Sequence, residues 1–255
     1  MATLQSTVID DTGFLVLPNG TSSNRPSPSG QMTRYNTLTS ALEVYDGSAW
    51  IRQESIPESG LVCNLDAAKY VSGTTWYDTS GSGNNGTLVG SPTWSSEVGG
   101  CFLFNGSSNY ISIPVNYTTG TWTVIGASRY TGSIRGRVIA STGNEFIMGH
   151  HSGYVGMLYC SGTVINDPYP GDILWRIFAA SGSSVADSWQ MYLNGYQIAS
   201  NNGGTAGPNG IELGGCYGTA EMSECEVAFI LVYNRVLTPD EITQIYVTKS
   251  ARFGL

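Results

Sequence analysis

Three glutamates lie within the six-residue segment Glu221-Met222-Ser223-Glu224-Cys225-Glu226. Side chains two positions apart on a β-strand point to the same face, so Glu224 and Glu226 would lie side by side if this segment is a strand. Retaining hydrolysis of a glycosidic bond requires two carboxyl groups about 5–5.5 Å apart. The other interpretation, which we favour, is an acidic strand face in contact with solvent.

The two histidines of the sequence, His150 and His151, are adjacent. Neighbouring side chains on a strand point to opposite faces, so the pair cannot bind one metal ion in regular β geometry. No cysteine or acidic residue lies at metal-ligand spacing around them, and nucleophilic catalysis lacks a motif. We interpret them as polar residues of a strand or loop, with contact to a ligand or a neighbouring subunit as the alternative.

Asp66, Asp78, Asn84 and Asn85 lie in turns that are rich in oxygen ligands. Calcium needs about six to eight such oxygens, and only a few are recognisable here. Turn geometry explains the pattern equally well, because Asp and Asn side chains accept hydrogen bonds from nearby backbone amides. Calcium therefore remains an alternative, and no other metal or cofactor is expected.

Aromatic rings beside Gly, Pro and amide side chains are candidates for stacking on sugar faces. Four aromatic residues stand out because they lie in a Gly- and Pro-rich stretch: Tyr154, Tyr159, Tyr169 and Trp175. Trp122 and Trp189 lie within apolar strands and are expected in the core. Together with the histidines, the candidate glycan-binding residues are His150, His151, Tyr154, Tyr169 and Trp175.

The composition around these residues is typical of an all-β protein. The 255 residues include 33 glycines, and only 12% are charged. Apolar alternation recurs about every ten residues after residue 100, which predicts an antiparallel sandwich. A single helix is predicted near the end, with Thr238 as N-cap, Pro239 in the first turn, and Ile242 and Ile245 on its apolar face.

The formal net charge of −8 argues against nucleic acid as a partner. No apolar run approaches the roughly 20 residues that span a bilayer. The first residues, MATLQSTVIDDTGF, lack the basic and apolar regions of a signal peptide, so we expect folding in a cytoplasm. The five cysteines are odd in number and widely spaced, which predicts reduced, buried thiols.

Residues 1–58 form a separate module in this interpretation, and residues 59–255 form the main domain. Alternating segments at residues 32–36 and 41–45 predict short strands, with too little core for much stability alone. The segment also resembles a recurrent element of tailed-phage particle proteins. The matching parts are residues 17–21 (LPNGT), 25–26 (RP), 30–36 (GQMTRYN) and 42–45 (LEVY), followed by Trp50.

This resemblance implies a role in virion assembly. The candidate anchoring residues are Arg25, Arg34, Tyr35, Tyr45 and Trp50. Arg34 could pair with a carboxylate of a partner protein. The alternative is that the arginine stabilises the turns of its own module.

The second module resembles laminin-G-like, concanavalin A-like jelly rolls. The matching segments are residues 60–67, 75–88, 102–113, 191–195 and 232–242. Residues 146–151 and 249–255 further resemble particle proteins of contractile-tailed phages that infect cyanobacteria. Glucanases of this fold place their acids as Glu-x-Asp-x-(x)-Glu, and the Asp is missing from residues 221–226, so we expect no enzymatic activity.

These resemblances imply a structural component of a tailed-phage particle: a decoration, fibre or spike protein that displays a lectin-like sandwich. We expect it in the virion, assembled in the bacterial cytoplasm, in contact with other virion proteins and with host glycan. By analogy with phage fibres, a homo-oligomer is expected, in the form of a trimer. The alternatives are a tail receptor-binding protein that recognises host polysaccharide, and a glycan depolymerase.

Overall fold

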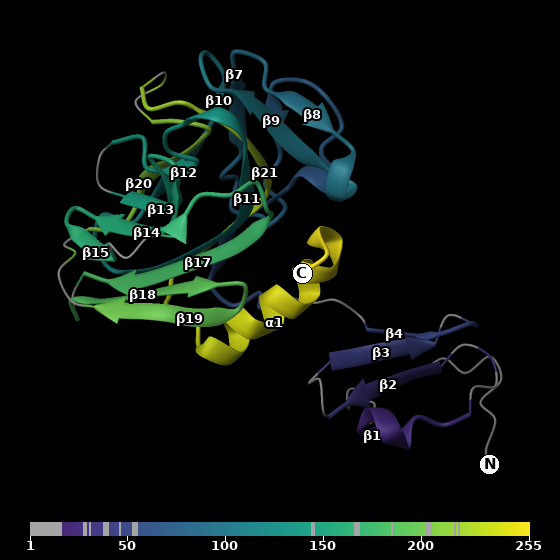
Figure 1. Cartoon of the computed structure of the whole chain (residues 1–255). Helices are drawn as coiled ribbons and strands as arrows, with labels where there is room; N and C mark the ends of the chain where they lie inside the picture. The colour runs from purple at the N-terminus through teal and green to yellow at the C-terminus, as the bar shows by residue number, and fades with distance from the viewer. Residues whose placement is uncertain are drawn as a thin grey trace. The chain divides into compact units, whose positions relative to one another are not determined.

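The computed structural model describes residues 17–27, 30, 32–37, 41–45, 47–52, 56–143, 146–165, 169–184, 186–201, 204, 206–216, 218 and 220–255. The chain divides into two compact units, Met1–Ser55 and Ile56–Leu255. Their elements are labelled in Figure 1. Within the described ranges, no helix is long and apolar enough to cross a membrane.

The first unit is a small sheet with the strand order β1-β2-β3-β4 (Figure 1). Its elements are β1 (Asn19–Gly20), the 3-10 turn η1 (Ser22–Asn24), β2 (Met32–Asn36), β3 (Ala41–Tyr45) and β4 (Trp50–Arg52). β1 pairs with β2 in parallel, and the other pairs are antiparallel. β2 and β3 coincide with the predicted alternating segments, whereas the apolar run at residues 14–16 lies outside the described residues.

The second unit is a sandwich of two antiparallel sheets, which confirms the predicted fold class. The nine-stranded sheet has the order β15-β14-β13-β12-β20-β10-β7-β6, with β16 paired to β14. Its strands are β6 (Thr75–Trp76), β7 (Gly86–Val89), β10 (Tyr110–Asn116), β12 (Ile139–Ala140), β13 (Phe146–His151), β14 (Tyr154–Cys160), β15 (Thr163–Ile165), β16 (Tyr169–Pro170) and β20 (Asn209–Leu213).

The eight-stranded sheet has the order β19-β18-β17-β11-β21-β9-β8, with β5 paired to β21. Its strands are β5 (Leu61–Asp66), β8 (Thr93–Ser95), β9 (Cys101–Asn105), β11 (Thr121–Arg135), β17 (Arg176–Ser183), β18 (Ser188–Leu193), β19 (Tyr196–Asn201) and β21 (Ser223–Tyr233). The helical elements of this unit are η2 (Ala67–Lys69), η3 (Glu97–Gly99), α1 (Pro239–Ser250) and η4 (Ala251–Phe253).

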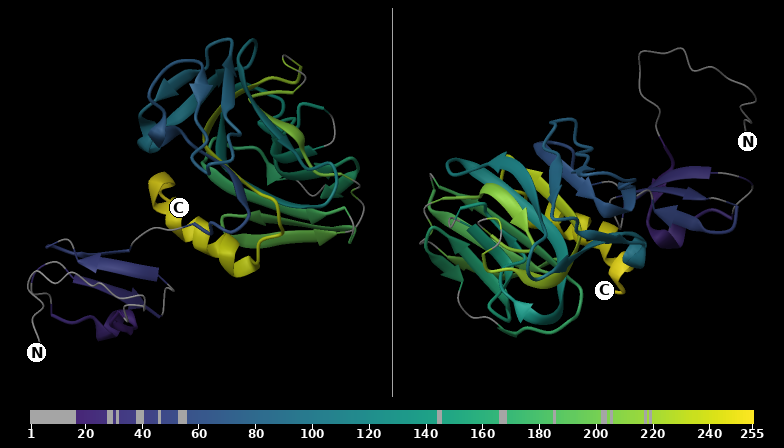
Figure 2. Two further views of the ribbon diagram at one scale, coloured as in Figure 1. Left: turned by 180° about the vertical axis from the view of Figure 1, so that it is seen from behind. Right: turned by 90° about the horizontal axis from the view of Figure 1, so that it is seen from above.

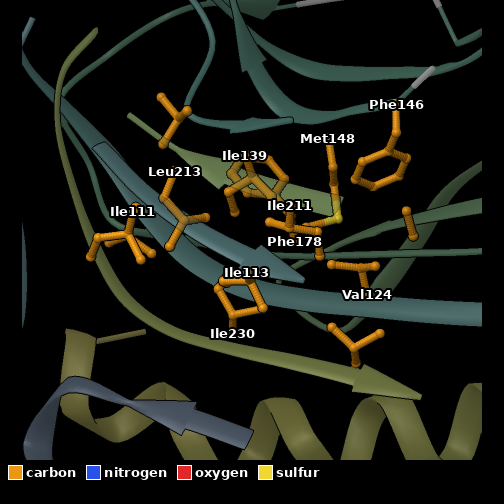
Figure 3. Close-up of a cluster of buried hydrophobic side chains, with 14 of the residues drawn as sticks. Ile111, Ile113, Val124, Ile139, Phe146, Met148, Phe178, Ile211, Leu213 and Ile230 are labelled. Carbon is orange, nitrogen blue, oxygen red and sulfur yellow. The ribbon is translucent and has the colours of Figure 1, made fainter. Parts of the chain in front are cut away.

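The main core lies between the two sheets, where apolar side chains from both inner faces interdigitate (Figure 3). Trp122 and Trp189 are fully enclosed there, as predicted, and their rings lie 5.9 Å apart. Glycine makes room for them, because a Cβ at Gly182 would overlap the Trp189 ring and one at Gly207 would overlap Trp122. All five cysteines are buried and unpaired with one another.

A second apolar layer lies between the eight-stranded sheet and helix α1, which runs along the outer face of that sheet (Figure 2). Ile242 and Ile245 of α1 are buried in this layer, as the apolar face of the predicted helix requires. Thr238 and Glu241 form the capping box that begins the helix. Helix α1 covers the outer face of the eight-stranded sheet, so the two outer faces of the sandwich differ in what packs against them.

Candidate functional site

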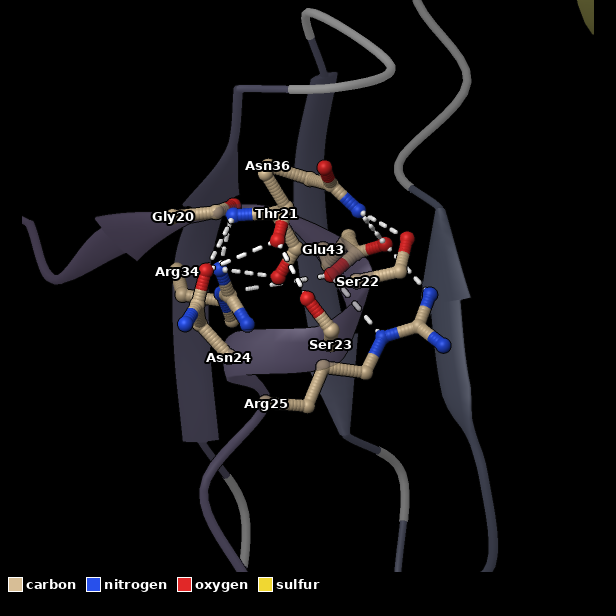
Figure 4. A network of polar contacts seen from close by, with 9 residues as sticks. All are labelled: Gly20, Thr21, Ser22, Ser23, Asn24, Arg25, Arg34, Asn36 and Glu43. Atoms are coloured by element: carbon tan, nitrogen blue, oxygen red, sulfur yellow. Dashed lines mark hydrogen bonds and ion pairs between the residues drawn. The ribbon is translucent and has the colours of Figure 1, made fainter.

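Several polar residues of the first module converge on one buried carboxylate, that of Glu43 (Figure 4). Arg25 donates to both of its oxygens, with Nη2 2.7 Å from Oε1 and Nε 3.3 Å from Oε2. Asn36 Nδ2 donates to Oε1 at 2.7 Å and to Ser22 Oγ at 2.9 Å. Arg34 Nε lies 4.0 Å from Oε2. The hydrogen bond from Arg25 lowers the pKa of Glu43, so the carboxylate stays ionised despite its burial.

Arg34 stabilises its own module, which was the alternative to a role in partner binding. Its Nη2 donates to the carbonyls of Gly20 and Thr21, 2.5 and 3.1 Å away, and its guanidinium lies over the Trp50 ring. Its side chain is almost fully enclosed, so a partner protein cannot reach it without opening the module. The residues of the motif, although far apart in the sequence, therefore contact one another inside the module.

The remaining anchoring candidates occupy different positions. The Tyr45 and Trp50 rings contact each other at 5.7 Å between centroids. Tyr35 is 40% exposed and points to the sheet face opposite the Glu43 network, since it alternates with Arg34 along β2. Among these candidates, Tyr35 offers the accessible aromatic surface.

In the second module, the acidic strand is not the solvated face that its sequence predicts. Glu226 is 4% exposed and its Oε2 accepts a hydrogen bond from Arg129 Nε at 2.6 Å. Glu224 Oε2 accepts from the backbone amides of Ser133 and Ile134 at 2.7 and 2.9 Å. The expectation fails for Glu226 because Arg129, which lies over the Trp175 ring, pairs with it and shields it from solvent. Both carboxylates are engaged by protein donors.

The oxygen-rich turn around Asp78 is explained by backbone capping. Asp78 Oδ1 accepts from the amides of Asn64 and Ser80, both at 2.8 Å, and Oδ2 accepts from the amide of Asn84 at 2.9 Å. Asn85 Oδ1 accepts from the amide of Asp78. Although burial opposes it, these hydrogen bonds lower the pKa of Asp78. Across the described ranges, no group of three or more His, Cys, Asp or Glu side chains is placed to hold a metal ion.

Two candidate glycan-binding residues lie inside the protein. His150 is fully buried between the rings of Tyr130 and Phe178, with Nδ1 3.1 Å from Ser128 Oγ. Burial lowers its pKa to about 3, so the ring is neutral. Trp175 is 6% exposed and packs between Arg129 and Phe253. These rings are unavailable to a ligand because they belong to the core between the sheets and to the helix layer respectively.

Two other candidates are brought together at the surface. His151 and Tyr154 are directly paired across the hairpin of β13 and β14, so their side chains project from the same side of the nine-stranded sheet. Tyr154 is 47% exposed. Tyr169 lies on β16 beside this hairpin, and its side chain is outside the described part of the chain. The half-exposed Tyr159 lies further along β14.

A fixed carboxylate completes this surface. Glu221 Oε2 lies 3.2 Å from His151 Nε2 and accepts from Arg137 Nε at 2.6 Å, while Arg137 Nη2 donates to Oε1 at 3.3 Å. The backbone amide of Arg137 also donates to the Glu221 carbonyl at 2.8 Å. Glu221 adopts φ 44°, a left-handed conformation that non-glycine residues seldom adopt. Arg137 therefore holds a strained residue in place with its carboxylate beside His151.

The electrostatics of Glu221 follow from these contacts. Partial burial would raise its pKa, but the hydrogen bond and the charge of Arg137 outweigh this effect and lower it. The site at neutral pH thus contains an ionised, half-exposed carboxylate, an imidazole and an exposed phenol ring. We call Tyr154, His151, Glu221 and Arg137 the hairpin site.

Sequence reasoning missed Glu221 and Arg137 as members of this site. They lie 84 positions apart and no local pattern links them. Their contact arises because residues 136–138 run beside the segment that follows β20, where Gly136 and Arg137 donate to the carbonyls of Met222 and Glu221. The positive φ of Glu221 could not be predicted from the sequence either, because glycine is the residue that usually indicates such a conformation.

The same sheet carries a shallow groove of about 340 Å³ over β10 and β20. Its lining is uncharged and comprises Ser112, Ile113, Pro114, Val115, Asn116, Thr142, Asn209 and Gly210. The groove has no aromatic residue in its lining, which distinguishes it from the hairpin site. For a ligand with apolar ring faces, the hairpin site is therefore the better candidate.

Comparisons with known proteins give no matching family model and no matching curated protein. Solved structures do match. A mutant Trypanosoma rangeli sialidase displaying trans-sialidase activity has a TM-score of 0.61 and 14% identity, over 87% of this chain and 44% of that chain. The similarity concerns the fold, a sandwich of two antiparallel β-sheets.

Two further structures share this sandwich fold. Domain 4 of AbnA, a GH43 extracellular arabinanase from Geobacillus stearothermophilus in complex with arabinotriose, has a TM-score of 0.54 and 16% identity, over 74% of this chain and all (100%) of that chain. The binding domain of botulinum neurotoxin DC in complex with SialylT has a TM-score of 0.56 and 12% identity, over 75% and 52%. This chain thus spans about half of the sialidase and neurotoxin chains, and at these identities the likeness concerns the fold.

Proposed function

We propose that this chain is a non-enzymatic structural protein of a tailed-phage particle that displays a glycan-binding lectin sandwich. The observation that carries the binding part is the hairpin site. It joins an exposed aromatic ring to a carboxylate that Arg137 holds in a fixed position, on the sheet that lies away from α1. Sugar-binding sites combine these features, since ring faces stack while fixed polar groups orient the hydroxyls.

The attachment part of the proposal is supported by the first module. The residues of its phage-like motif build one polar network around Glu43, so the motif defines a self-contained unit suited to reuse in different particle proteins. Tyr35 leaves an accessible ring on the opposite face of its sheet for a partner. We propose that this unit joins the chain to capsid or tail proteins and to its own copies, as a trimer.

We propose that the chain is not an enzyme, because the carboxylates of the acidic strand are bound by other groups of the protein. Glu226 is paired with Arg129 and Glu224 caps two backbone amides, so neither carboxylate is placed to act on a sugar. Incubation with bacterial surface polysaccharide should release no reducing sugar. If sugar were released and Glu226→Gln abolished the release, the alternative of a depolymerase would replace this proposal.

Glycan binding is tested with the full chain on a glycan array. Tyr154→Ala should weaken binding at least tenfold, because it removes the stacking ring. Tyr196→Ala is the matched control, since Tyr196 is 77% exposed on β19 of the other sheet. Equal binding by both variants would place the glycan elsewhere, and no binding by the wild type would reject the lectin function.

Attachment is tested by deleting residues 1–55 and adding the purified protein to particles that lack it. The sandwich should remain folded, because it has its own core, and should no longer join particles. A truncated protein that still decorates particles would contradict the anchoring role. Cryo-microscopy of the particle distinguishes a decoration protein from the alternative of a tail receptor-binding protein.

A further inference from the structure

We infer that the hairpin site binds an uncharged sugar through its hydroxyl groups and discriminates against sugars that carry a carboxylate. This inference rests on the proposed glycan-binding function and adds the chemical class of the ligand.

The charge that a ligand meets at this site is the carboxylate of Glu221. The Glu221 side chain is 44% exposed, whereas the Arg137 side chain is 7% exposed. Arg137 directs Nε and Nη2 at the two oxygens of Glu221 and therefore presents its charge to the protein. A ligand carboxylate would approach a like charge, while a ligand hydroxyl would donate to it.

Glu221 also keeps the capacity to accept hydrogen bonds from a ligand. Within the described residues, the hydrogen bond to Oε1 comes from Arg137 Nη2 at 3.3 Å, which is long for such a bond. An ionised carboxylate has about four acceptor positions, so Oε1 can take one or two sugar hydroxyls. Tyr154, paired with His151 on the same side of the sheet, offers its ring to the apolar face of the same sugar.

The other arginines toward this end of the sandwich are already engaged. Arg135 donates to the carbonyls of Gly132 and Gly171 at 2.8 and 2.9 Å. Arg176 pairs with Asp172 at 2.6 Å. Neither arginine is therefore directed at the hairpin site, and His151 Nε2 is directed at Glu221. The net charge of −8 adds to the repulsion of an acidic sugar.

The test measures binding of the full chain to pairs of sugars in which one member is neutral and the other carries one or more carboxylates. The pairs are lactose with 3′-sialyllactose, and methyl-esterified with de-esterified oligogalacturonides, immobilised at equal density at pH 7. The neutral member should bind at least tenfold more tightly in every pair that binds. Glu221→Gln should weaken binding of the neutral member and reduce its preference over the acidic member to below threefold.

The matched control is Glu58→Gln, which removes one negative charge from an exposed residue elsewhere in the sandwich. It should leave both affinities unchanged, which separates the local effect from that of net charge. Tyr154→Ala supplies a second variant that leaves Glu221 intact, and it should weaken both members equally. Equal or tighter binding of the acidic member by the wild type would overturn the inference and leave glycan binding standing. Failure of every probe to bind would reject the proposed function and this inference with it.

Discussion

Arg252 Nη1 lies 2.6 Å from Asp66 Oδ1, so a residue near the C-terminus is bound to the end of the first strand of the sandwich. Lys249 Nζ contacts the other carboxylate oxygen at 3.0 Å. Arg252 also donates to the carbonyls of Val98 and Gly100. Lys249 and Arg252 thus act as a clasp that holds α1 and η4 against the end of β5.

Asp66→Asn should lower the free energy of unfolding by about 2–3 kcal/mol, because it leaves two cations beside a neutral amide. Burial opposes ionisation of Asp66, but the charges of Lys249 and Arg252 outweigh it and lower its pKa. A carboxyl with a lowered pKa stabilises the fold above its unfolded pKa of 3.8, and this contribution is lost as the pH falls below that value. Urea unfolding at pH 7 and pH 3 measures both effects. An unchanged midpoint at pH 7 would contradict the clasp.

His150 should make the sandwich less stable in mild acid. Its folded pKa is about 3 and its unfolded value is 6.5, so the unfolded chain binds a proton that the folded chain cannot. Stability is complete above pH 6.5 and falls as the pH drops, by about 1.4 kcal/mol per pH unit, or about 3 kcal/mol by pH 4.5. His150→Gln should flatten this dependence between pH 6.5 and 4.5, whatever its effect on stability at pH 7. Tyr196→Ala, at an exposed residue of β19, is the control and should retain the full slope.

Glu43→Gln should destabilise the first module by about 2 kcal/mol, because it removes the charge that Arg25 and Arg34 share. Hydrogen–deuterium exchange should become faster in β2 and β3 and stay unchanged in β11 and β21, which belong to the other unit. Tyr35→Ala, on the opposite face of the sheet, should leave exchange unchanged and reduce incorporation into particles. If Glu43→Gln reduced binding to particles and Tyr35→Ala did not, the contact with the partner protein would instead lie at the Glu43 network.

The cysteines should contribute to stability as buried thiols. Burial raises the pKa of Cys63 far above its usual range and that of Cys101 to about 12, so neither forms a reactive thiolate at neutral pH. Cys63→Ser should cost about 1–3 kcal/mol for an ill-satisfied hydroxyl. Dithiothreitol should leave the melting temperature unchanged, and a thiol reagent should label the cysteines only on unfolding. A melting temperature that drops by many degrees on reduction would show structural disulfides.

Much of the architecture could be predicted from the sequence because it depends on local chemistry. Alternation with a period of two predicted β2, β3 and the strands of the sandwich, since one face of each strand must be buried. Thr238 as N-cap and Pro239 in the first turn marked the start of α1 without any tertiary information, and the structure confirms both. Widely spaced cysteines of odd number predicted the free thiols that the structure contains.

The members of the candidate site were decided by the tertiary structure. Alternation placed His150 and His151 on opposite faces, but it could not say which face is the core. The pairing of β13 with β14 also shifts in register between Gly149 and His150. Trp175 is enclosed because Phe253 of η4 returns from the end of the chain to pack against it, and Glu226 pairs with Arg129, which lies over the Trp175 ring. Arg137 and Glu221 meet only when two loops are brought side by side. Exposure depends on what packs against a strand, and a period of two in the sequence carries no information about the packing partner.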